Sequence, residues 1–197
     1  MARYDDVHKE TSRQEILDRA AERLRRDGIA AVGLRGLMAD AGLTHGAFYA
    51  HFDSKADLVA EAVDHAVGQT YAYFEHELAE VPQDRKMDRL VEIYLHPRHR
   101  EEMSIGCVAS ALAPEIARGD TALRQRFSDR NANFLGLIAD CLPAGGTAAQ
   151  RADRATTVFA AMLGTLQLAR AEADQARAEA LLKAGRAAAL LIARQPF

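Results

Sequence analysis

Several features are scarce in this chain of 197 residues, and the scarcity of cysteine and of long apolar runs excludes two classes of protein. There are two cysteines, Cys107 and Cys141, five prolines and no tryptophan. Two cysteines are too few for a disulfide framework, and they lack the Cys-x-x-Cys spacing of a redox or zinc motif. The apolar run 187–193 lies between Arg186 and Arg194 and is too short to cross a bilayer. We therefore expect a folded globular protein with no membrane partner.

Charge gives no general sign of a nucleic-acid ligand. The net charge is -3, and residues 1–55 contain nine Lys and Arg against nine Asp and Glu. A protein that reads a DNA groove nevertheless needs only a local cluster of donors, and hydroxyls, histidines and backbone amides also contact phosphates. Residues 1–9 are charged and lack the apolar stretch of a secretory signal, so we expect a cytoplasmic location.

The spacing of apolar residues predicts an all-α fold, because no stretch alternates β-branched and polar residues. The first helix is expected to open with a capping box, Ser12 and Glu15, and to stop at Gly28. Two short helices should follow, 34–41 before Gly42 and 45–51 with Thr44 as the N-cap.

A longer helix is predicted to open with a second capping box, Ser54 and Asp57, and to reach Leu78. The later helices are expected over 84–95, 107–118, 120–141, 147–173 and 175–194. The last two are rich in alanine and leucine on more than one face, so they need partners on several sides. Packing within one chain could supply these partners, but a bundle shared by two protomers is the favoured interpretation.

The stretch from Gly28 to Leu58 has the size of a DNA-binding helix-turn-helix. Its second short helix carries hydrogen-bonding side chains, Thr44, His45, Tyr49 and His51, and little apolar surface to bury. Gly46 costs about 1 kcal/mol relative to alanine within a helix, which suggests close approach to another surface. That surface could be a DNA groove or a neighbouring helix, and Gly46 alone does not separate the two.

These residues carry a family resemblance. Ala41 to Thr44, then Phe48 to Phe52, then Ser54, Lys55 and Leu58 resemble the signature of the TetR/AcrR family of bacterial regulators. Tyr49, Phe52 and Lys55 match the Tyr-x-x-Phe-x-x-Lys pattern that follows the helix-turn-helix in that family. The resemblance covers about the first quarter of the chain, and the remainder agrees in length and helical character.

The resemblance implies a three-helix DNA-binding domain over 1–55 and a six-helix effector and dimerisation domain over 56–197. It implies a homodimer that binds a near-palindromic double-stranded DNA operator, acts as a repressor and is released by an unknown small-molecule effector. The implied DNA contacts are to bases or nearby phosphates from Thr44, His45, Gly46 and Ala47, and to the backbone from Arg35, Tyr49, His51 and Lys55.

Two features of the second domain are candidates for effector recognition. Cys107 is predicted at the N-terminus of a helix, where the helix dipole favours the thiolate, so it is a possible sensor thiol. A buried small side chain is the favoured interpretation of the same residue. The alternative is a pocket for a small molecule, and helical spacing suggests its lining as Tyr71, Phe74, Met103, Leu112, Phe134, Phe159 and Met162.

Motifs for catalysis are missing from the sequence. It has no phosphate loop, dinucleotide fingerprint or nucleophile elbow, and His76-Glu77 lacks the second histidine of a zinc protease motif. His96 and His99 flank Pro97 in what is expected to be an exposed basic loop, a weak candidate for a metal site. We therefore predict no enzyme activity, metal or cofactor. The alternative to a regulator is a helical small-molecule-binding or protein-interaction module that does not bind DNA.

Overall fold

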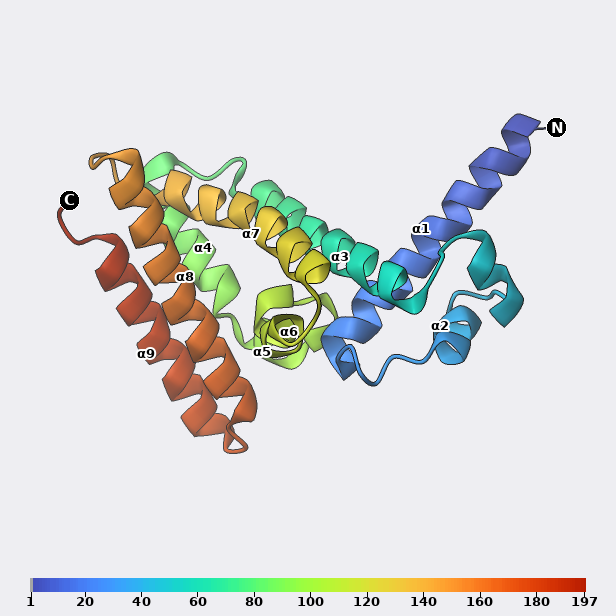
Figure 1. The fold of residues 1–197 in the computed structure, drawn as a ribbon. Helices are drawn as coiled ribbons and strands as arrows, with labels where there is room; N and C mark the ends of the chain where they lie inside the picture. Colours follow the sequence, from blue (N-terminus) through green and yellow to red (C-terminus); the bar gives the residue numbers. More distant parts are fainter. Residues whose placement is uncertain (1) are drawn as a thin grey trace.

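The computed structural model describes the backbone of residues 2–197 and the side chains of residues 9–197. Within this range the chain forms nine α-helices and three short 3₁₀ helices and contains no strand, so the all-α prediction is confirmed. Figure 1 shows an elongated molecule with α1 and α2 at one end and the antiparallel pair α8 and α9 at the other. No helix in the described part of the chain is both long and apolar enough to cross a membrane.

The small end of the molecule consists of α1 (Ala2–Asp27), α2 (Leu34–Asp40) and the 3₁₀ helix η1 (His45–Ala50). Gly28 and Gly42 end α1 and α2 with positive φ angles of 84° and 69°, as the sequence predicts for both glycines. The predicted start of the first helix is wrong, because α1 begins at Ala2 and Ser12 lies buried inside it. Neither proline nor glycine precedes Gly28, so nothing interrupts the helix ahead of Ser12 and no cap is needed there.

A long helix, α3 (Lys55–Leu78), connects the two ends of the molecule. The hydroxyl of Ser54 accepts a hydrogen bond from the Asp57 amide at 3.0 Å, which confirms the predicted cap. One buried face of α3 packs on α1 near its beginning, and the opposite end of α3 packs on α4 and α7. The helix therefore belongs to both hydrophobic clusters of the protein, and the predicted domain boundary at residue 55 stays a prediction.

The remaining helices match the predicted ranges to within two residues at each end. They are α4 (Lys86–Tyr94), α6 (Val108–Ala117), α7 (Thr121–Cys141), α8 (Ala148–Ala171) and α9 (Gln175–Ala193), with 3₁₀ turns η2 (Gln83–Arg85) and η3 (Met103–Ile105). A difference occurs at α5 (Pro97–Glu101), where the sequence analysis expects an exposed loop. His96 caps this short helix and Pro97 occupies its first turn, where a missing amide hydrogen costs nothing.

Two buried clusters form the core. The first unites α1, α2, η1 and the start of α3 with Val108, Leu112 and Ile116 of α6. The second fills the space among α4, α7, α8 and α9, and its aromatic centre is Phe74, Tyr94, Phe134 and Phe159, with ring centroids 5.1–6.4 Å apart. Because α6 contributes to the first cluster, the large end of the molecule packs directly against the small end.

Candidate nucleic-acid interface and ligand cavity

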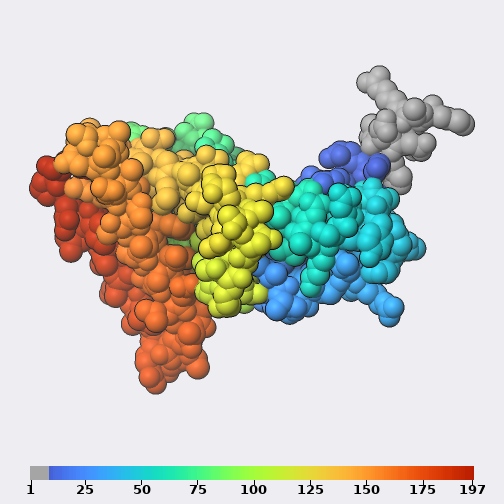
Figure 2. Space-filling view, in the orientation of Figure 1, coloured from blue at the N-terminus to red at the C-terminus, as the bar shows by residue number. Residues whose placement is uncertain are grey.

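The turn between α2 and η1 is fixed by backbone bonds and by two phenylalanines. The Leu43 amide donates to the Met38 carbonyl at 2.8 Å, and Gly42 provides the left-handed conformation. Phe48 and Phe52 are buried, and their stacked rings lie 5.7 Å apart beneath η1. These two buried rings leave the other side of η1 facing outward, at the small end of the molecule (Figure 2).

Most of the predicted DNA-contacting residues lie on this outward surface. Thr44 is the N-cap of η1, but its side chain makes no capping hydrogen bond. Tyr49 is 66% exposed, a large value for an aromatic residue next to a buried one. Thr44, His45, Gly46, Tyr49, Arg35 and Lys55 are exposed, whereas Ala47 and His51 are half-buried. The structure thus brings together the residues that the resemblance implies, and their roles stay predictions.

The surroundings of Gly46 bear on one of its two interpretations. A Cβ atom built at Gly46 meets nothing within 4 Å in the described part of the protein. Packing against a neighbouring helix therefore does not require a glycine here. Close approach of Gly46 to a DNA groove stays a prediction.

Charge on this surface is not neutralised from within the protein. Arg35 and Lys55 form no ion pair with any of residues 9–197. Lys55 is also the first residue of α3, where the partial positive charge of the helix end disfavours a cation. By contrast, Arg13 and Arg23 nearby are paired with Glu61 and Asp40 at 2.5 Å. The two unpaired cations are therefore available to an external anion.

His51 differs from its neighbours because its ring is partly turned inward. Its Nδ1 is buried and has no hydrogen-bond partner among the described residues. Burial, with the nearby charges of Lys9 and Arg13, lowers the pKa of His51. The ring is consequently neutral at neutral pH, and it would contact a phosphate as a hydrogen-bond donor rather than as a cation.

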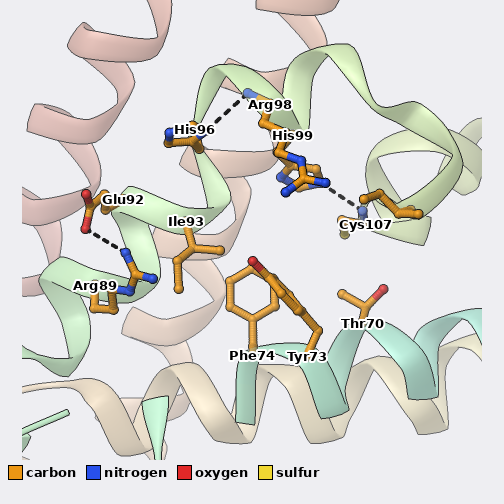
Figure 3. Close-up of a pocket in the computed structure, with 11 residues that line it drawn as sticks. Thr70, Tyr73, Phe74, Arg89, Glu92, Ile93, His96, Arg98, His99 and Cys107 are labelled. Atoms are coloured by element: carbon orange, nitrogen blue, oxygen red, sulfur yellow. Dashed lines mark hydrogen bonds and ion pairs between the residues drawn. The ribbon is translucent and has the colours of Figure 1, made fainter. Parts of the chain in front are cut away.

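A cavity of about 360 Å³ lies in the large end of the molecule, between α3, α4, α5 and η3. Figure 3 shows Tyr73, Phe74 and Thr70 on one side and Ile93 on another, with Arg89 and Glu92 paired at the edge. The cavity is also lined by His96, Arg98, His99, Ile105 and Cys107. Its size is within the range of small-molecule sites.

Of the seven residues predicted to line a pocket, Phe74 lines this cavity, and Phe134 lines a much smaller one that shares Thr70 and Cys107 with it. The other five line neither: Leu112 is in the core against α1, and Phe159 and Met162 are buried in the second cluster. Tyr71 is half-buried and donates a hydrogen bond to Glu75, and Met103 is half-buried in η3. Tyr73, Ile93 and the polar residues of α4 and α5 were not predicted to line a pocket, because helical spacing does not reveal how α5 and η3 fold over α3.

His99 is a structural residue of the cavity wall. Its Nδ1 donates to the Tyr94 carbonyl at 2.6 Å, and its Nε2 accepts from the Cys107 amide at 2.9 Å. Burial lowers the pKa of His99 to about 4, so the neutral ring that this pairing requires is the form at neutral pH. The expectation of an exposed loop is therefore wrong at His99, and both of its ring nitrogens are occupied.

Cys107 is the N-cap of α6, and its thiol reaches the cavity from a buried position. Tyr94 packs nearby, and its buried hydroxyl has no hydrogen-bond partner among the described residues. Burial, followed by the influence of Cys107, raises the pKa of Tyr94 well above its ordinary value. Cys141 lies apart from this group, and burial raises its pKa to about 11.

Comparison with known proteins gives the family. Residues 16–62 match the profile of bacterial regulatory proteins of the tetR family. Residues 85–186, more than half of the chain, match the C-terminal domain profile of LmrA/YxaF-like transcriptional regulators. The chain therefore belongs to the TetR family of transcriptional regulators, with a helix-turn-helix at its N-terminal end. No protein in the curated set matches the sequence.

Solved structures share the whole fold at low sequence identity. A TetR-family regulator from Cytophaga hutchinsonii has a TM-score of 0.78 and 16% identity, with 96% of this chain and 98% of that chain covered. Escherichia coli NemR in its reduced form has a TM-score of 0.75 and 18% identity, covering 94% and 98%. Bacillus subtilis FadR in complex with stearoyl-CoA has a TM-score of 0.68 and 15% identity, covering 93% and 99%. These likenesses establish the fold.

Proposed function

We propose that this protein is a cytoplasmic transcription repressor that binds a near-palindromic operator as a homodimer and is released by an effector. It acts by binding, without catalysis. The observation that carries the proposal is the outward surface of η1 and its flanks. Among residues 9–197, the Thr44 side chain makes no capping bond, His51 Nδ1 has no hydrogen-bond partner, and Arg35 and Lys55 form no ion pair. The buried rings of Phe48 and Phe52 anchor this surface from its inner side.

The residues divide into two groups by position. Thr44, His45, Gly46 and Ala47 occupy the N-terminal end of η1 and would meet base edges or adjacent phosphates in the major groove. Arg35, Tyr49, His51 and Lys55 flank that end and would hold the DNA backbone. Backbone contacts set the register and the salt dependence of binding, and base contacts set the sequence preference.

The exposed faces of α8 and α9 support dimerisation. Leu168 is 62% exposed and Leu191 is 68% exposed, so each presents an apolar side chain with little contact in one chain. Small residues, including Ala160, Ala180 and Ala187, lie exposed on the same two helices and would permit close helix packing. A symmetric pairing of these faces would form a four-helix bundle and place two recognition helices on one operator.

Two alternative triggers at the same cavity would release the protein from DNA. A small molecule could fill the space beside Phe74, Tyr73 and Ile93, or a modifying agent could react with the Cys107 thiol. The solved FadR structure contains stearoyl-CoA, and the NemR structure is of a reduced form. Either trigger would act by changing the separation of the two recognition helices, so that both half-sites can no longer be engaged together.

The first test is selection of DNA from a random library by the purified protein, followed by fluorescence anisotropy with the enriched sequence over a salt series. We expect Tyr49→Ala and Lys55→Ala each to weaken binding about 10-fold, and Lys55→Ala to reduce the salt slope by about one. Matched controls are Tyr71→Ala and Lys86→Ala, which lie outside both the η1 surface and the cavity and should bind like the wild type.

The outcomes separate the alternatives. Enrichment of a two-fold symmetric sequence would support the dimeric repressor. If no sequence is enriched, or if the η1 variants and the controls bind alike, the protein-interaction module without DNA binding becomes the better description.

The thiol trigger has its own test. N-ethylmaleimide should release the wild-type protein from the selected DNA and leave Cys107→Ser bound, with Cys141→Ser responding like the wild type. Equal responses of the wild type and Cys107→Ser would remove thiol modification from the proposal and leave the small molecule as the trigger.

A further inference from the structure

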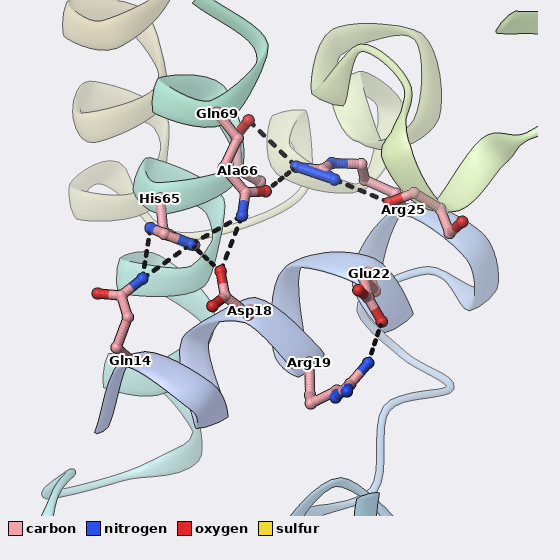
Figure 4. Close-up of polar contacts among 9 residues, drawn as sticks. Gln14, Asp18, Arg19, Glu22, Arg25, His65, Ala66 and Gln69 are labelled. Carbon is pink, nitrogen blue, oxygen red and sulfur yellow. Dashed lines mark hydrogen bonds and ion pairs between the residues drawn. The ribbon is translucent and has the colours of Figure 1, made fainter. Parts of the chain in front are cut away.

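Arg25, near the end of α1, is a buried arginine that donates no hydrogen bond to a carboxylate of the described residues. Its side chain is 4% exposed. The guanidinium donates to the Ser104 carbonyl in η3 at 2.8 Å, and to the Ala66 carbonyl and Gln69 Oε1 of α3 at 3.3 and 2.5 Å. Figure 4 shows this side chain reaching from α1 toward α3 and η3. Burial lowers the pKa of Arg25, and the nearby charges of Glu22 and Asp18 offset this only in part. A buried cation whose hydrogen-bond acceptors are all neutral is costly, which argues that its position serves more than the stability of α1.

A second tie joins the end of α1 to α6. The Glu115 carboxylate accepts hydrogen bonds from the Ile29 and Ala30 amides at 2.8 and 3.1 Å. These amides directly follow Gly28, whose φ of 84° turns the chain out of α1. Glu115 therefore fixes the turn that leads into α2 and the recognition surface.

The segment between the two ties forms part of the cavity wall. Ser104 and Glu115 are its ends, and Ile105 and Cys107 within it line the cavity. The wall is tightly backed at Gly106 and Cys107, because a Cβ atom at Gly106 would lie 2.8 Å from Arg170 Nη2 and 2.9 Å from His99 Nε2, and Cys107 is 4% exposed. Ile105 differs, since it is 59% exposed and also borders an open groove beside Arg25. An occupant that displaces Cys107 must therefore move the backbone of the segment rather than compress it.

We propose that Arg25 and Glu115 couple the cavity to the DNA-binding helices by transmitting movement of the segment 104–115 to α1. This inference rests on the proposed function and names the residues through which the effector would act. They are positioning residues, since neither lines the cavity nor belongs to the η1 surface. Gln69 extends the connection, because its amide also donates to Asp18 of α1 at 2.8 Å, and Asp18 contacts His65 at 2.7 Å (Figure 4).

The first experiment replaces the unidentified effector with a larger side chain inside the cavity. Ile93→Trp adds bulk from α4, on the opposite wall from the segment 104–115. We expect this substitution to weaken binding of the selected DNA by about 10-fold when Arg25 is present, and by less than about 2-fold in an Arg25→Met background. Ile93→Leu, which adds no bulk, is the control in both backgrounds.

Additive effects would overturn the proposal. If Ile93→Trp weakens binding by the same factor with and without Arg25, or has no effect in either background, the cavity does not act through this residue. Circular dichroism melts of all six proteins establish that each is folded at the temperature of the binding measurement.

A second experiment uses reciprocity and needs no substitution in the cavity. An effector site that weakens DNA binding must itself respond to DNA. We expect the selected DNA to change the rate at which iodoacetamide alkylates Cys107 by about 5-fold and to leave Cys141 unchanged, as followed by peptide mass spectrometry. Cys141 is buried at the C-terminal end of α7, away from the cavity, and serves as the internal reference.

The variants then identify the route. Glu115→Ala and Arg25→Lys should reduce the DNA-induced change at Cys107 to less than about 2-fold, whereas Glu115→Gln should retain it because an amide oxygen still accepts both hydrogen bonds. An unchanged Cys107 rate in DNA-bound wild type, or the full change in Glu115→Ala and Arg25→Lys, would overturn the coupling. If the wild type enriches no DNA at all, the proposed function itself fails, which is a separate and recognisable result.

Discussion

The surface of η1 and the segment 96–107 are both short, irregular and rich in polar side chains, yet they use those side chains in opposite ways. In the segment 96–107, His96 caps α5, His99 uses both ring nitrogens, and Arg100 donates to carbonyls of Ala169 and Glu172. At η1, the Thr44 hydroxyl caps nothing and Tyr49 projects into solvent. The difference teaches that polar composition alone does not mark a binding surface. A side chain that the fold does not use is the better sign of an external partner.

The prediction with the largest expected effect concerns Leu191, an apolar side chain that a single chain leaves exposed. Leu191 is 68% exposed on α9. Leu191→Glu should separate the dimer and weaken operator binding about 1000-fold, on the order of 4 kcal/mol, because one recognition helix then binds without the other. Analytical ultracentrifugation and anisotropy measure the two effects. Ala132→Glu on the exposed side of α7 is the control, and a Leu191→Glu dimer of normal affinity would show that this face is not the interface.

The next test addresses Gly46, a position in η1 where the surrounding protein leaves room for a side chain. Gly46→Leu has open space around its Cβ and should leave the unfolding free energy unchanged or raise it by up to about 1 kcal/mol. The same change should weaken operator binding about 100-fold, because the side chain would stand between η1 and the groove.

Gly136 provides the matched control for that substitution. It is exposed on α7 and also has nothing within 4 Å of a built Cβ. Gly136→Leu should leave DNA affinity unchanged. Equal operator affinity of Gly46→Leu and wild type would mean that η1 does not approach DNA closely at this point. Urea unfolding of both variants checks that their folds are intact.

A third test sharpens the other side of the comparison, where His99 is used inside the protein. Burial lowers its pKa to about 4 from the ordinary 6.5, so the unfolded chain takes up a proton first as the pH falls. The contribution of the neutral His99 ring to the free energy of unfolding is therefore fully present near pH 7 and decreases toward pH 4. Between about pH 7 and pH 5 the expected loss is about 2 kcal/mol.

Urea unfolding at the two pH values measures this loss. His51 also has a lowered pKa and acts in the same direction, so the wild type alone does not isolate His99. His99→Asn, which removes the titrating ring, should show a pH dependence smaller by about 2 kcal/mol, although its stability at pH 7 is lower. The same pH dependence in both proteins would contradict a buried, neutral His99.

Much of this architecture could be predicted from the sequence, since it depends on local rules. Gly28, Gly42 and Ser54 mark helix ends by backbone conformation or capping, and the structure places the ends there. The family pattern likewise indicated that Tyr49 and Lys55 lie together outside the core. Ser12 misled because a Ser-x-x-Glu pattern marks a start only where the preceding residues are not helical.

The cavity and its connection to α1 could not be predicted in the same way. Arg25 and Ser104 are 79 positions apart, and Glu115 lies 85 or more positions from the amides that it binds. Their contacts depend on the angles at which α5, η3 and α6 cross α1 and α3, and helical periodicity contains no information on these angles. Phe74 was found because it lies on a buried face that also borders the cavity.

The smallest expected effect comes from comparing Ser54 with Thr44, two hydroxyl residues at helix starts. Ser54 caps α3 through the Asp57 amide, whereas the Thr44 side chain makes no capping bond in η1. Ser54→Ala should therefore lower the unfolding free energy by about 1 kcal/mol, and Thr44→Ala should lower it by less than about 0.5 kcal/mol. Operator affinity should reverse the order, with Thr44→Ala weakening binding about 5-fold and Ser54→Ala acting mainly through stability. Denaturation and anisotropy on the same four samples, wild type, both single variants and the double variant, decide the matter. A Thr44→Ala protein that loses stability but not affinity would show that its hydroxyl serves the fold, and the contrast between used and unused side chains would fail at the residue where it is most direct.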